Sequence, residues 1–176
     1  MRLEKASDLL PGDVGFSVIP GTIGGWVNIG QALLRDSCVW THAYLVLPDG
    51  MLIEAIPSGA RIVPVADRFG PDYAYARLPL TLEQRAKMGS IGEELEGTPY
   101  SFADYLALAA LEWHLPTWRW LREYVSSSGH MICSQLVDYA LCRAGFHLFD
   151  DGRLPQDVTP GALYWRCARI GSVYMD

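Results

Sequence analysis

A run of alternating side chains, followed by a turn and a second apolar run, limits what this chain can fold into. Residues 39–47 alternate between two faces, as a β-strand requires. Pro48-Asp49-Gly50 is a turn signal, and residues 51–56 have the pattern of a returning strand. The pattern therefore predicts an antiparallel hairpin.

The length of the turn sets which residues of this hairpin face each other. The first strand is expected to place Trp40, His42, Tyr44 and Val46 on one face and Thr41, Ala43, Leu45 and Leu47 on the other. A three-residue loop pairs Leu47 with Met51 and sets Tyr44 opposite Glu54. His42 and Glu54 then lie diagonally on one face, roughly 7–8 Å apart at Cα, within reach of a side-chain hydrogen bond. A two-residue loop would shift the register by one and separate them.

A cysteine at the predicted start of an amphipathic helix is the second informative feature. From Cys133 onward apolar residues recur at helical spacing, and Gly145 is a typical stop signal. Cys133 falls in the middle of the apolar stripe, and Cys142 falls on the opposite side. The N–H groups and dipole of a helix N-terminus favour a thiolate, so Cys133 is a candidate nucleophile. The alternative is a small buried hydrophobic residue.

Further elements are predicted on both sides of the hairpin. A turn at residues 11–13 leads into a strand ending near Val18, and Asp13 is interpreted as a turn carboxylate. Strands are expected at 61–65, 73–78 and, as an edge strand, 168–174; helices are expected at 26–34, at 81–96 with a Thr81/Gln84 capping box, and from 160 with Thr159 as cap. This mixture predicts an α+β fold with an antiparallel sheet packed against helices.

Length and composition bound the class of protein. The 176 residues, half of them hydrophobic, are expected to form a single globular domain, residues 1–176. A formal net charge of −6 without a basic tract gives no support for nucleic-acid binding. The four cysteines are widely spaced and lack a CxxC or finger pattern, which argues against a zinc site or a disulfide framework and leaves a single bridge open.

Targeting and membrane signals are weak. Residues 1–8 contain acids and lack the apolar region of a signal peptide. The apolar stretch at 102–121 is interrupted by charged residues and a proline, so no integral membrane segment is expected. These observations favour a cytoplasmic or phage-encoded, virion-delivered protein, and they leave the oligomeric state open.

Four histidines compete to be the base beside the thiol: His42, His114, His130 and His147. A lone histidine is more often structural than catalytic. His42 differs because the predicted hairpin places a carboxylate, Glu54, on its own face. Cysteine, histidine and carboxylate are the groups that nucleophilic catalysis requires.

Five blocks of the sequence resemble the NlpC-type branch of papain-like cysteine peptidases, in circularly permuted order. The blocks are Leu10-Pro11-Gly12-Asp13, Thr41-His42-Ala43-Tyr44-Leu45-Val46, Leu52-Ile53-Glu54-Ala55, Gly97-Thr98-Pro99-Tyr100 and Ile132-Cys133-Ser134-Gln135-Leu136-Val137. In the standard order the last two blocks come first. The permuted order is similar to that of YiiX-like hydrolases and lecithin:retinol acyltransferase-like proteins, and the match spans residues 10–163.

The resemblance implies a circularly permuted papain-like fold with the nucleophile at a helix N-terminus. Cys133 carries over as nucleophile, His42 as base and Glu54 as the third polar residue. Tyr100 matches a tyrosine that lies near the cysteine and helps bind substrate or oxyanion, and Ser134 is expected in the same substrate and oxyanion region. The backbone N–H of Cys133 would be an oxyanion donor.

Two features depart from the family pattern. Ile132 and Gln135 replace the acid and the glycine of the usual Asp-Cys-Ser-Gly, and the Trp-rich residues 111–124 have no counterpart. The leading hypothesis is a cysteine hydrolase that cleaves an amide bond, possibly of peptidoglycan type, through an acyl-enzyme on Cys133. The alternatives are a thiol acyltransferase, a lipid or ester hydrolase, and a non-catalytic binding module. The expected partner is a peptide, cell-wall or acyl-ester substrate, and no metal or cofactor is expected.

Overall fold

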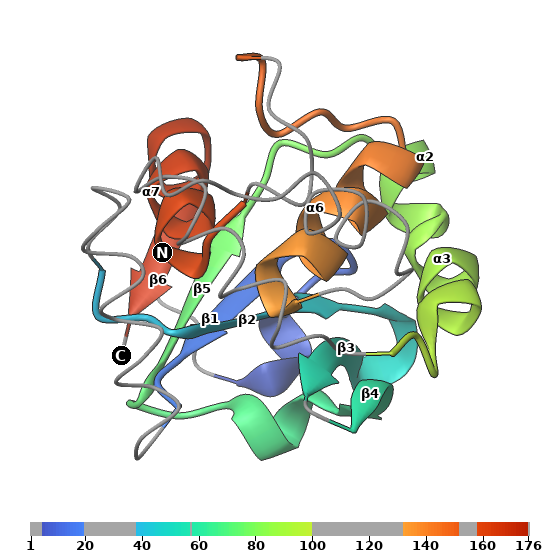
Figure 1. Cartoon of the computed structure of the whole chain (residues 1–176), viewed down its shortest axis with the longest axis horizontal. Coiled ribbons are helices and arrows are strands. Elements are labelled where there is room, and N and C mark those ends of the chain that lie inside the picture. The colour runs from blue at the N-terminus through green and yellow to red at the C-terminus, as the bar shows by residue number, and fades with distance from the viewer. Residues whose placement is uncertain (1–4, 20–37, 57, 100–131, 152–157, 176) are drawn as a thin grey trace, which may run out of the picture.

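A six-stranded antiparallel sheet with the strand order β4-β3-β2-β1-β5-β6 organises the structure (Figure 1). The computed structural model describes residues 5–19, 38–56, 58–99, 132–151 and 158–175. The strands are β1 (Val14–Ser17), β2 (His42–Val46), β3 (Met51–Ile56), β4 (Gly59–Pro64), β5 (Tyr73–Arg77) and β6 (Ser172–Met175). The helices are α2 (Leu82–Ala86), α3 (Met88–Leu95), α6 (Cys133–Arg143) and α7 (Pro160–Ile170), with short 3-10 turns η1 (Ala6–Asp8), η2 (Pro48–Gly50) and η3 (Val65–Arg68). The predicted α+β class is confirmed.

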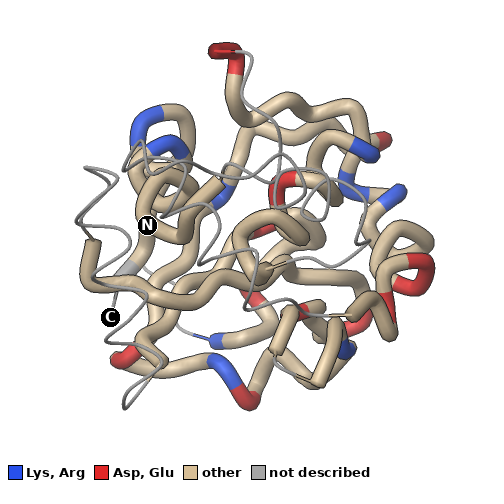
Figure 2. Tube along the Cα trace, in the orientation of Figure 1, with Lys and Arg blue, Asp and Glu red and all other residues tan. Residues whose placement is uncertain are grey.

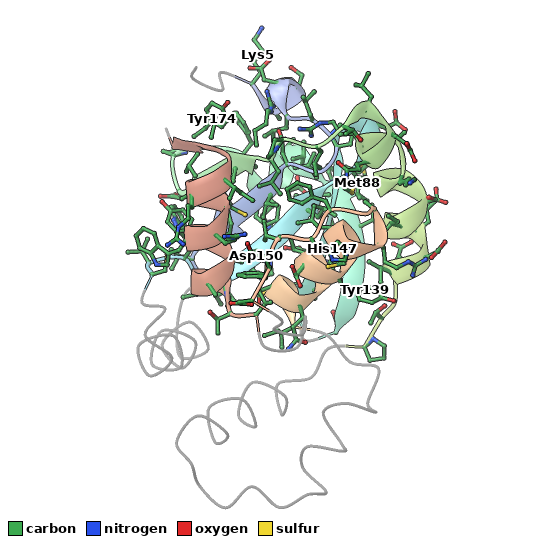
Figure 3. All side chains as sticks on the ribbon, turned by 90° about the horizontal axis from the view of Figure 1, so that it is seen from above. Lys5, Met88, Tyr139, His147, Asp150 and Tyr174 are labelled. Atoms are coloured by element: carbon green, nitrogen blue, oxygen red, sulfur yellow. The ribbon has the colours of Figure 1, made fainter. Side chains whose placement is uncertain are left out.

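The sheet separates two hydrophobic clusters. The larger cluster joins α3, α6 and α7 to one face of the sheet, and the smaller one lies on the other face around Leu9, Tyr44 and Tyr75. Figure 3 accordingly shows Tyr139 of α6 and Lys5 on opposite sides of the sheet. Helix α6 packs on β2 and β3, the two strands of the hairpin. The start of the cysteine helix is thereby brought to the hairpin.

The register of this hairpin is the one that a three-residue loop predicts. The loop is η2, and the Leu47 N–H donates to the Met51 carbonyl at 2.8 Å. Tyr44 then pairs with Glu54. Asp49 and Gly50 have φ angles of 58° and 70°, a left-handed backbone that aspartate and glycine adopt more readily than other residues. The sequence-based register is therefore confirmed.

One face assignment in the hairpin is wrong. Trp40 packs in the same cluster as Ala43 and Leu45, and not with Tyr44. The regular strand begins only at His42, after a bend at Val39. Because strict alternation holds only inside regular β-structure, the predicted pattern fails before His42.

The helix caps follow the sequence predictions, whereas two element boundaries differ. Thr81 accepts a hydrogen bond from the Gln84 N–H, and Thr159 accepts one from the Ala162 N–H. The predicted helix 81–96 is divided at Lys87, whose N–H is shared between two carbonyls of the preceding turn. Helix α7 continues to Ile170, so the edge strand begins at Ser172 and not at 168. The helix persists because Leu163 and Cys167, one turn apart, are both buried.

Asp13 closes its turn as predicted and also pairs with two arginines. Its carboxylate accepts the Leu10 N–H at 2.9 Å. Arg77 of β5 and Arg85 of α2 reach the same buried carboxylate at 2.7 and 3.2 Å. A charge this deeply buried requires such partners. Asp13 therefore joins the start of β1 to two distant elements.

Several predictions fall outside the described residues: the helix at 26–34, the apolar stretch at 102–121, the Trp-rich residues 111–124 and Tyr100. In the part of the chain that is described, no helix is both long and apolar enough to cross a bilayer. Basic and acidic residues are interspersed along that part (Figure 2).

Gly15 lies in the middle of the sheet between two tyrosines. In the register it is opposite Tyr44 on β2 and Tyr75 on β5. A Cβ atom at Gly15 would overlap the ring of Tyr44. The glycine leaves room for that ring to lie against Tyr75, with ring centroids 6.1 Å apart in an edge-to-face arrangement.

Gly15→Ala is expected to lower the free energy of unfolding by about 1–3 kcal/mol, because the buried ring of Tyr44 must move. Urea denaturation followed by circular dichroism measures the change. The matched control is Gly89→Ala in α3, where a Cβ would lie 3.4 Å from the nearest atom of Pro48, an ordinary contact. Equal stabilities of the two variants would contradict the assigned role of Gly15.

Candidate active site

Cys133, His42 and Glu54 meet at one end of the hairpin. Cys133 is the first residue of α6, His42 is the first residue of β2, and Glu54 lies inside β3. All three are buried, with exposed fractions of 4%, 6% and 0%. The structure therefore brings the thiol of Cys133 to two side chains that lie 79 or more residues away from it in the sequence.

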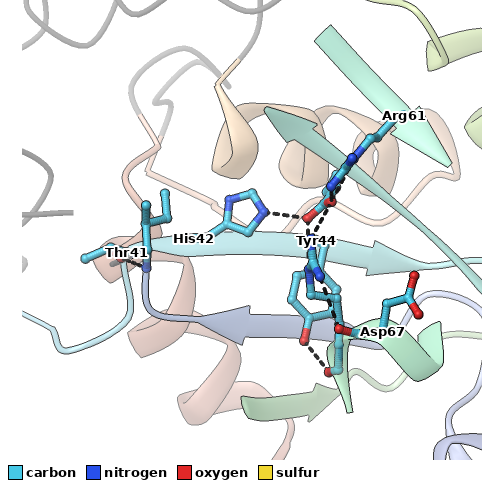
Figure 4. A network of polar contacts seen from close by, with 8 residues as sticks. Thr41, His42, Tyr44, Arg61 and Asp67 are labelled. Carbon is cyan, nitrogen blue, oxygen red and sulfur yellow. Dashed lines mark hydrogen bonds and ion pairs between the residues drawn. The ribbon is translucent and has the colours of Figure 1, made fainter. Parts of the chain in front are cut away.

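The imidazole of His42 lies between the carboxylate and the thiol. Its Nε2 is 2.9 Å from Oε2 of Glu54, the diagonal contact that the register predicts. Figure 4 shows the ring of His42 directed at this carboxylate, with Arg61 approaching it from the other side. Since Nε2 is used by Glu54, Nδ1 is the ring nitrogen left for the thiol of Cys133, which lies close enough to His42 to raise the pKa of the imidazole.

Glu54 is held by two arginines as well as by His42. Arg61 donates Nε and Nη2 to Oε1 at 3.0 and 2.7 Å. Arg68 donates Nη2 to Oε1 at 2.9 Å and Nε to Oε2 at 3.3 Å. Burial by itself would raise the pKa of Glu54, but the hydrogen bonds from His42 and the arginines outweigh it and lower the pKa to about 2. Glu54 is thus a carboxylate at any ordinary pH.

The position of His42 favours the imidazolium. Burial opposes the charge and would lower the pKa of His42. Hydrogen bonds and charge interactions with Cys133 and Glu54 are together stronger, and they raise the pKa to about 9. His42 therefore carries a proton at neutral pH.

The thiol of Cys133 is shifted in the opposite direction. Burial would raise its pKa, but the hydrogen bond and charge of His42 lower it, together with the backbone N–H groups of Ala43 and Ser134. In contrast, burial raises the pKa values of Cys38, Cys142 and Cys167. All four cysteines lie in the described part of the chain, and no disulfide joins them. Cys133 alone among them has the environment of a reactive thiolate.

The serine after this cysteine contributes through its backbone. The hydroxyl of Ser134 donates to the Val158 carbonyl at 2.5 Å, next to the cap of α7. Its side chain is therefore engaged in joining α6 to α7, and its N–H faces the sulfur of Cys133. Gln135 accepts the N–H of Ile132 at 3.1 Å and so closes the first turn of α6. Tyr100 lies outside the described residues.

A cleft of about 700 Å³ opens beside the His42–Glu54 pair. Most of its wall is apolar, and the charged residues that line it are His42, Glu54, Arg68 and Asp72. The described residues around it are Ser17, Val18, Ile19, Val39, Trp40, His42, Glu54, Ala55, Ile56, Arg68, Pro71, Asp72 and Tyr73. The imidazole thus borders both the cleft and the thiol.

Sequence reasoning missed the two arginines on Glu54. Arg61 is the cross-strand partner of Glu54 on β4, so the register of the second hairpin would have revealed it. Arg68 comes from the η3 turn, whose placement against β3 has no signal in the sequence.

Comparison with known proteins identifies the fold. The crystal structure of the metalloprotein YiiX from Escherichia coli O157:H7, assigned to DUF1105, superposes with a TM-score of 0.60 at 17% identity, over 88% of this chain and 91% of that one. No family model matches the chain. No curated protein matches it either. The chain therefore has a YiiX-like α+β fold.

The described residues at this site do not form a donor set that suits a metal ion. Within the described ranges, no group of three or more histidine, cysteine or acidic side chains is arranged to hold one. Both oxygens of Glu54 are bound to guanidinium groups, whose positive charge opposes a cation at this position.

Glu54→Gln is expected to lower the free energy of unfolding by roughly 3 kcal/mol at pH 7, because two guanidinium groups and His42 lose their counter-ion. A lowered carboxyl pKa stabilises the folded state above the unfolded value of about 4.3, and this stabilisation is lost as pH falls toward 2. The difference in the free energy of unfolding between wild type and variant should therefore shrink as the pH falls from about 4.3 to about 2. Urea titrations across this range measure it.

Glu94→Gln is the matched control. Glu94 pairs with Arg143 on the surface, and both side chains are exposed. Its loss should cost less than about 1 kcal/mol at every pH. A Glu54 variant as mild as this control would show that the buried carboxylate does not depend on its partners.

Proposed function

We propose that this chain is a cysteine hydrolase of the circularly permuted papain-like, NlpC-type group, and that it cleaves an amide bond through an acyl-enzyme on Cys133. The observation that supports the proposal is the His42–Glu54 hydrogen bond beside a buried helix-start cysteine whose pKa is lowered by His42. A thiolate and imidazolium in contact are the ground state that thiol acyl transfer requires.

The residues fit a two-step reaction. The Cys133 thiolate attacks the amide carbonyl, and the backbone N–H at the start of α6 stabilises the oxyanion. The His42 imidazolium gives its proton to the leaving amine as the C–N bond breaks, which leaves a thioester. Neutral His42 then takes a proton from water, and the hydroxide attacks the thioester carbonyl. Collapse of the tetrahedral intermediate breaks the C–S bond, which releases the carboxylic acid and leaves the Cys133 thiolate beside the His42 imidazolium. Glu54 keeps the imidazole oriented and stabilises its charge.

The first test is the pH dependence of alkylation by iodoacetamide, resolved for each cysteine by peptide mass spectrometry. Cys133 is expected to react with a midpoint well below the ~8.5 of an unperturbed thiol, whereas Cys38 and Cys142 react only above it. The midpoint is the useful quantity because, unlike the absolute rate, it does not depend on how accessible a buried thiol is.

His42→Ala should move the Cys133 midpoint above 8.5, since burial then acts on the thiol without the imidazolium. His147→Ala, which changes an exposed histidine, should leave the midpoint unchanged. A wild-type Cys133 midpoint equal to that of Cys142 would instead support a non-catalytic module in which Cys133 is a packing residue.

The apolar wall of the cleft supports a second candidate, a thiol-dependent hydrolase or acyltransferase acting on lipid or other acyl esters. Val18 and Val39 are exposed apolar side chains at this cleft. Exposed aliphatic surface beside the imidazole would favour a substrate with an apolar acyl group.

Peptidoglycan fragments and phospholipid vesicles, each incubated with the protein and analysed by mass spectrometry, distinguish the two candidates. An amide hydrolase releases a new amine and carboxylate from the fragments, and an esterase releases fatty acid from the vesicles. Transfer is detected as an acylated product when an amine acceptor is added. Cys133→Ala should lower the rate at which either product forms by at least about 10³-fold.

Val39→Asp tests the cleft, with Leu82→Asp, an exposed residue of α2, as its control. If esters are the substrate, the cleft variant should impair long acyl chains more than short ones, and the control should impair neither. If the protein instead cleaves peptidoglycan fragments in preference to phospholipids, and Val39→Asp leaves this preference unchanged, the amide hydrolase is favoured.

A further inference from the structure

Arg68 is fixed in place at its backbone. Its carbonyl oxygen accepts hydrogen bonds from two buried phenols, Tyr44 on β2 at 3.1 Å and Tyr75 on β5. Burial raises the pKa of Tyr44 far above its usual value, so this phenol stays a donor across the working pH range. The two rings converge on one carbonyl because Gly15 lies between them without a side chain.

The guanidinium of Arg68 is fixed as well, and it spans the carboxylate of Glu54. Nε meets Oε2 at 3.3 Å and Nη2 meets Oε1 at 2.9 Å, while Nη1 donates to the carbonyl of Asp67 at 3.1 Å. A planar fork that contacts both oxygens defines the plane of the carboxylate. Oε2, the oxygen that Arg68 shares with His42, is thereby aimed at the imidazole.

Arg61 binds the same carboxylate differently. Both of its donors contact Oε1, the oxygen that does not contact His42. Contacts to one oxygen leave the carboxylate able to rotate about its terminal bond, which is a soft torsion. Arg61 is also 46% exposed, whereas Arg68 is 26% exposed and lines the cleft. The two arginines carry the same charge but impose different geometry.

We propose that Arg68 is a positioning residue that holds the carboxylate of Glu54 in the orientation that keeps His42 directed at Cys133. The inference rests on the proposed function, in which the thiolate of Cys133 is the nucleophile. Arg68 acts through Glu54, and Arg61 serves mainly as a counter-charge. The orientation of the carboxylate therefore depends on the η3 turn and on the phenols that hold it.

Lysine substitution separates geometry from charge, because lysine keeps the positive charge and loses the planar fork. The readout is the acid limb of the Cys133 alkylation profile, which is the pH range where the alkylation rate rises as the thiol ionises. The midpoint of this limb is sensitive to every charge near His42. The groups concerned are Cys133 of α6, Tyr44 of β2, Glu54 of β3, Arg61 of β4, Arg68 of η3, Tyr73 and Tyr75 of β5, and Asp72 at the cleft. Only one of them changes in each variant.

Arg68→Lys is expected to move the acid limb of the Cys133 profile upward by about one pH unit, which is about a tenfold slower reaction below the limb. Arg61→Lys, the matched control, should move it by less than about 0.3 unit. Circular dichroism establishes that each variant is folded. If Arg68→Lys does not fold, Arg68→Gln replaces it and should shift the limb at least as far, since it removes the charge too.

Two results would overturn the role of Arg68. One is an Arg68 variant in which the midpoint of the acid limb is unchanged, even if the melting temperature falls. Substitution of a purely structural residue would lower stability without changing the alkylation profile of Cys133. The other is an equal shift in the Arg61 and Arg68 variants, which would reduce both to counter-charges. A wild-type limb near 8.5 would reject the proposed function itself, so the two failures are distinguishable.

Discussion

The buried carboxylate of Glu54 is the interaction on which the site depends. A carboxylate with no exposed surface is costly unless hydrogen bonds replace the water that it has lost. Here His42, Arg61 and Arg68 supply those bonds from β2, β4 and the η3 turn. Strand pairing around β3 and ionisation of Glu54 are therefore linked, because separating the strands would leave the charge without partners.

A similar balance governs the thiol and the imidazole. Burial disfavours charge on either group alone, yet each stabilises the charge on the other. Helix α6 makes this possible by starting at Cys133 and packing on the hairpin, so the sulfur meets His42 and the backbone N–H groups of Ala43 and Ser134. In the proposed reaction the same balance lets the proton move from His42 to a leaving group and return.

The far face of the sheet supports the site through the backbone of Arg68. Tyr44 and Tyr75, whose rings lie together over Gly15, hold the carbonyl of Arg68 and so connect the smaller hydrophobic cluster to Glu54. In the role proposed for Arg68, packing around these two rings influences the orientation of the Glu54 carboxylate. Through this connection Gly15, Tyr44 and Tyr75 support the position of Arg68.

Local sequence determined the hairpin register, the helix caps and the start of the cysteine helix, because turn length, side-chain alternation and capping act within a few residues. Those local rules were sufficient to place Glu54 beside His42. They failed at Trp40, where the strand had not yet become regular, and at Ile170, where packing prolonged α7. Only the tertiary structure decided that Cys133 meets His42 and that Arg68 spans Glu54, since these contacts join segments distant in sequence, and no local propensity specifies how such segments pack.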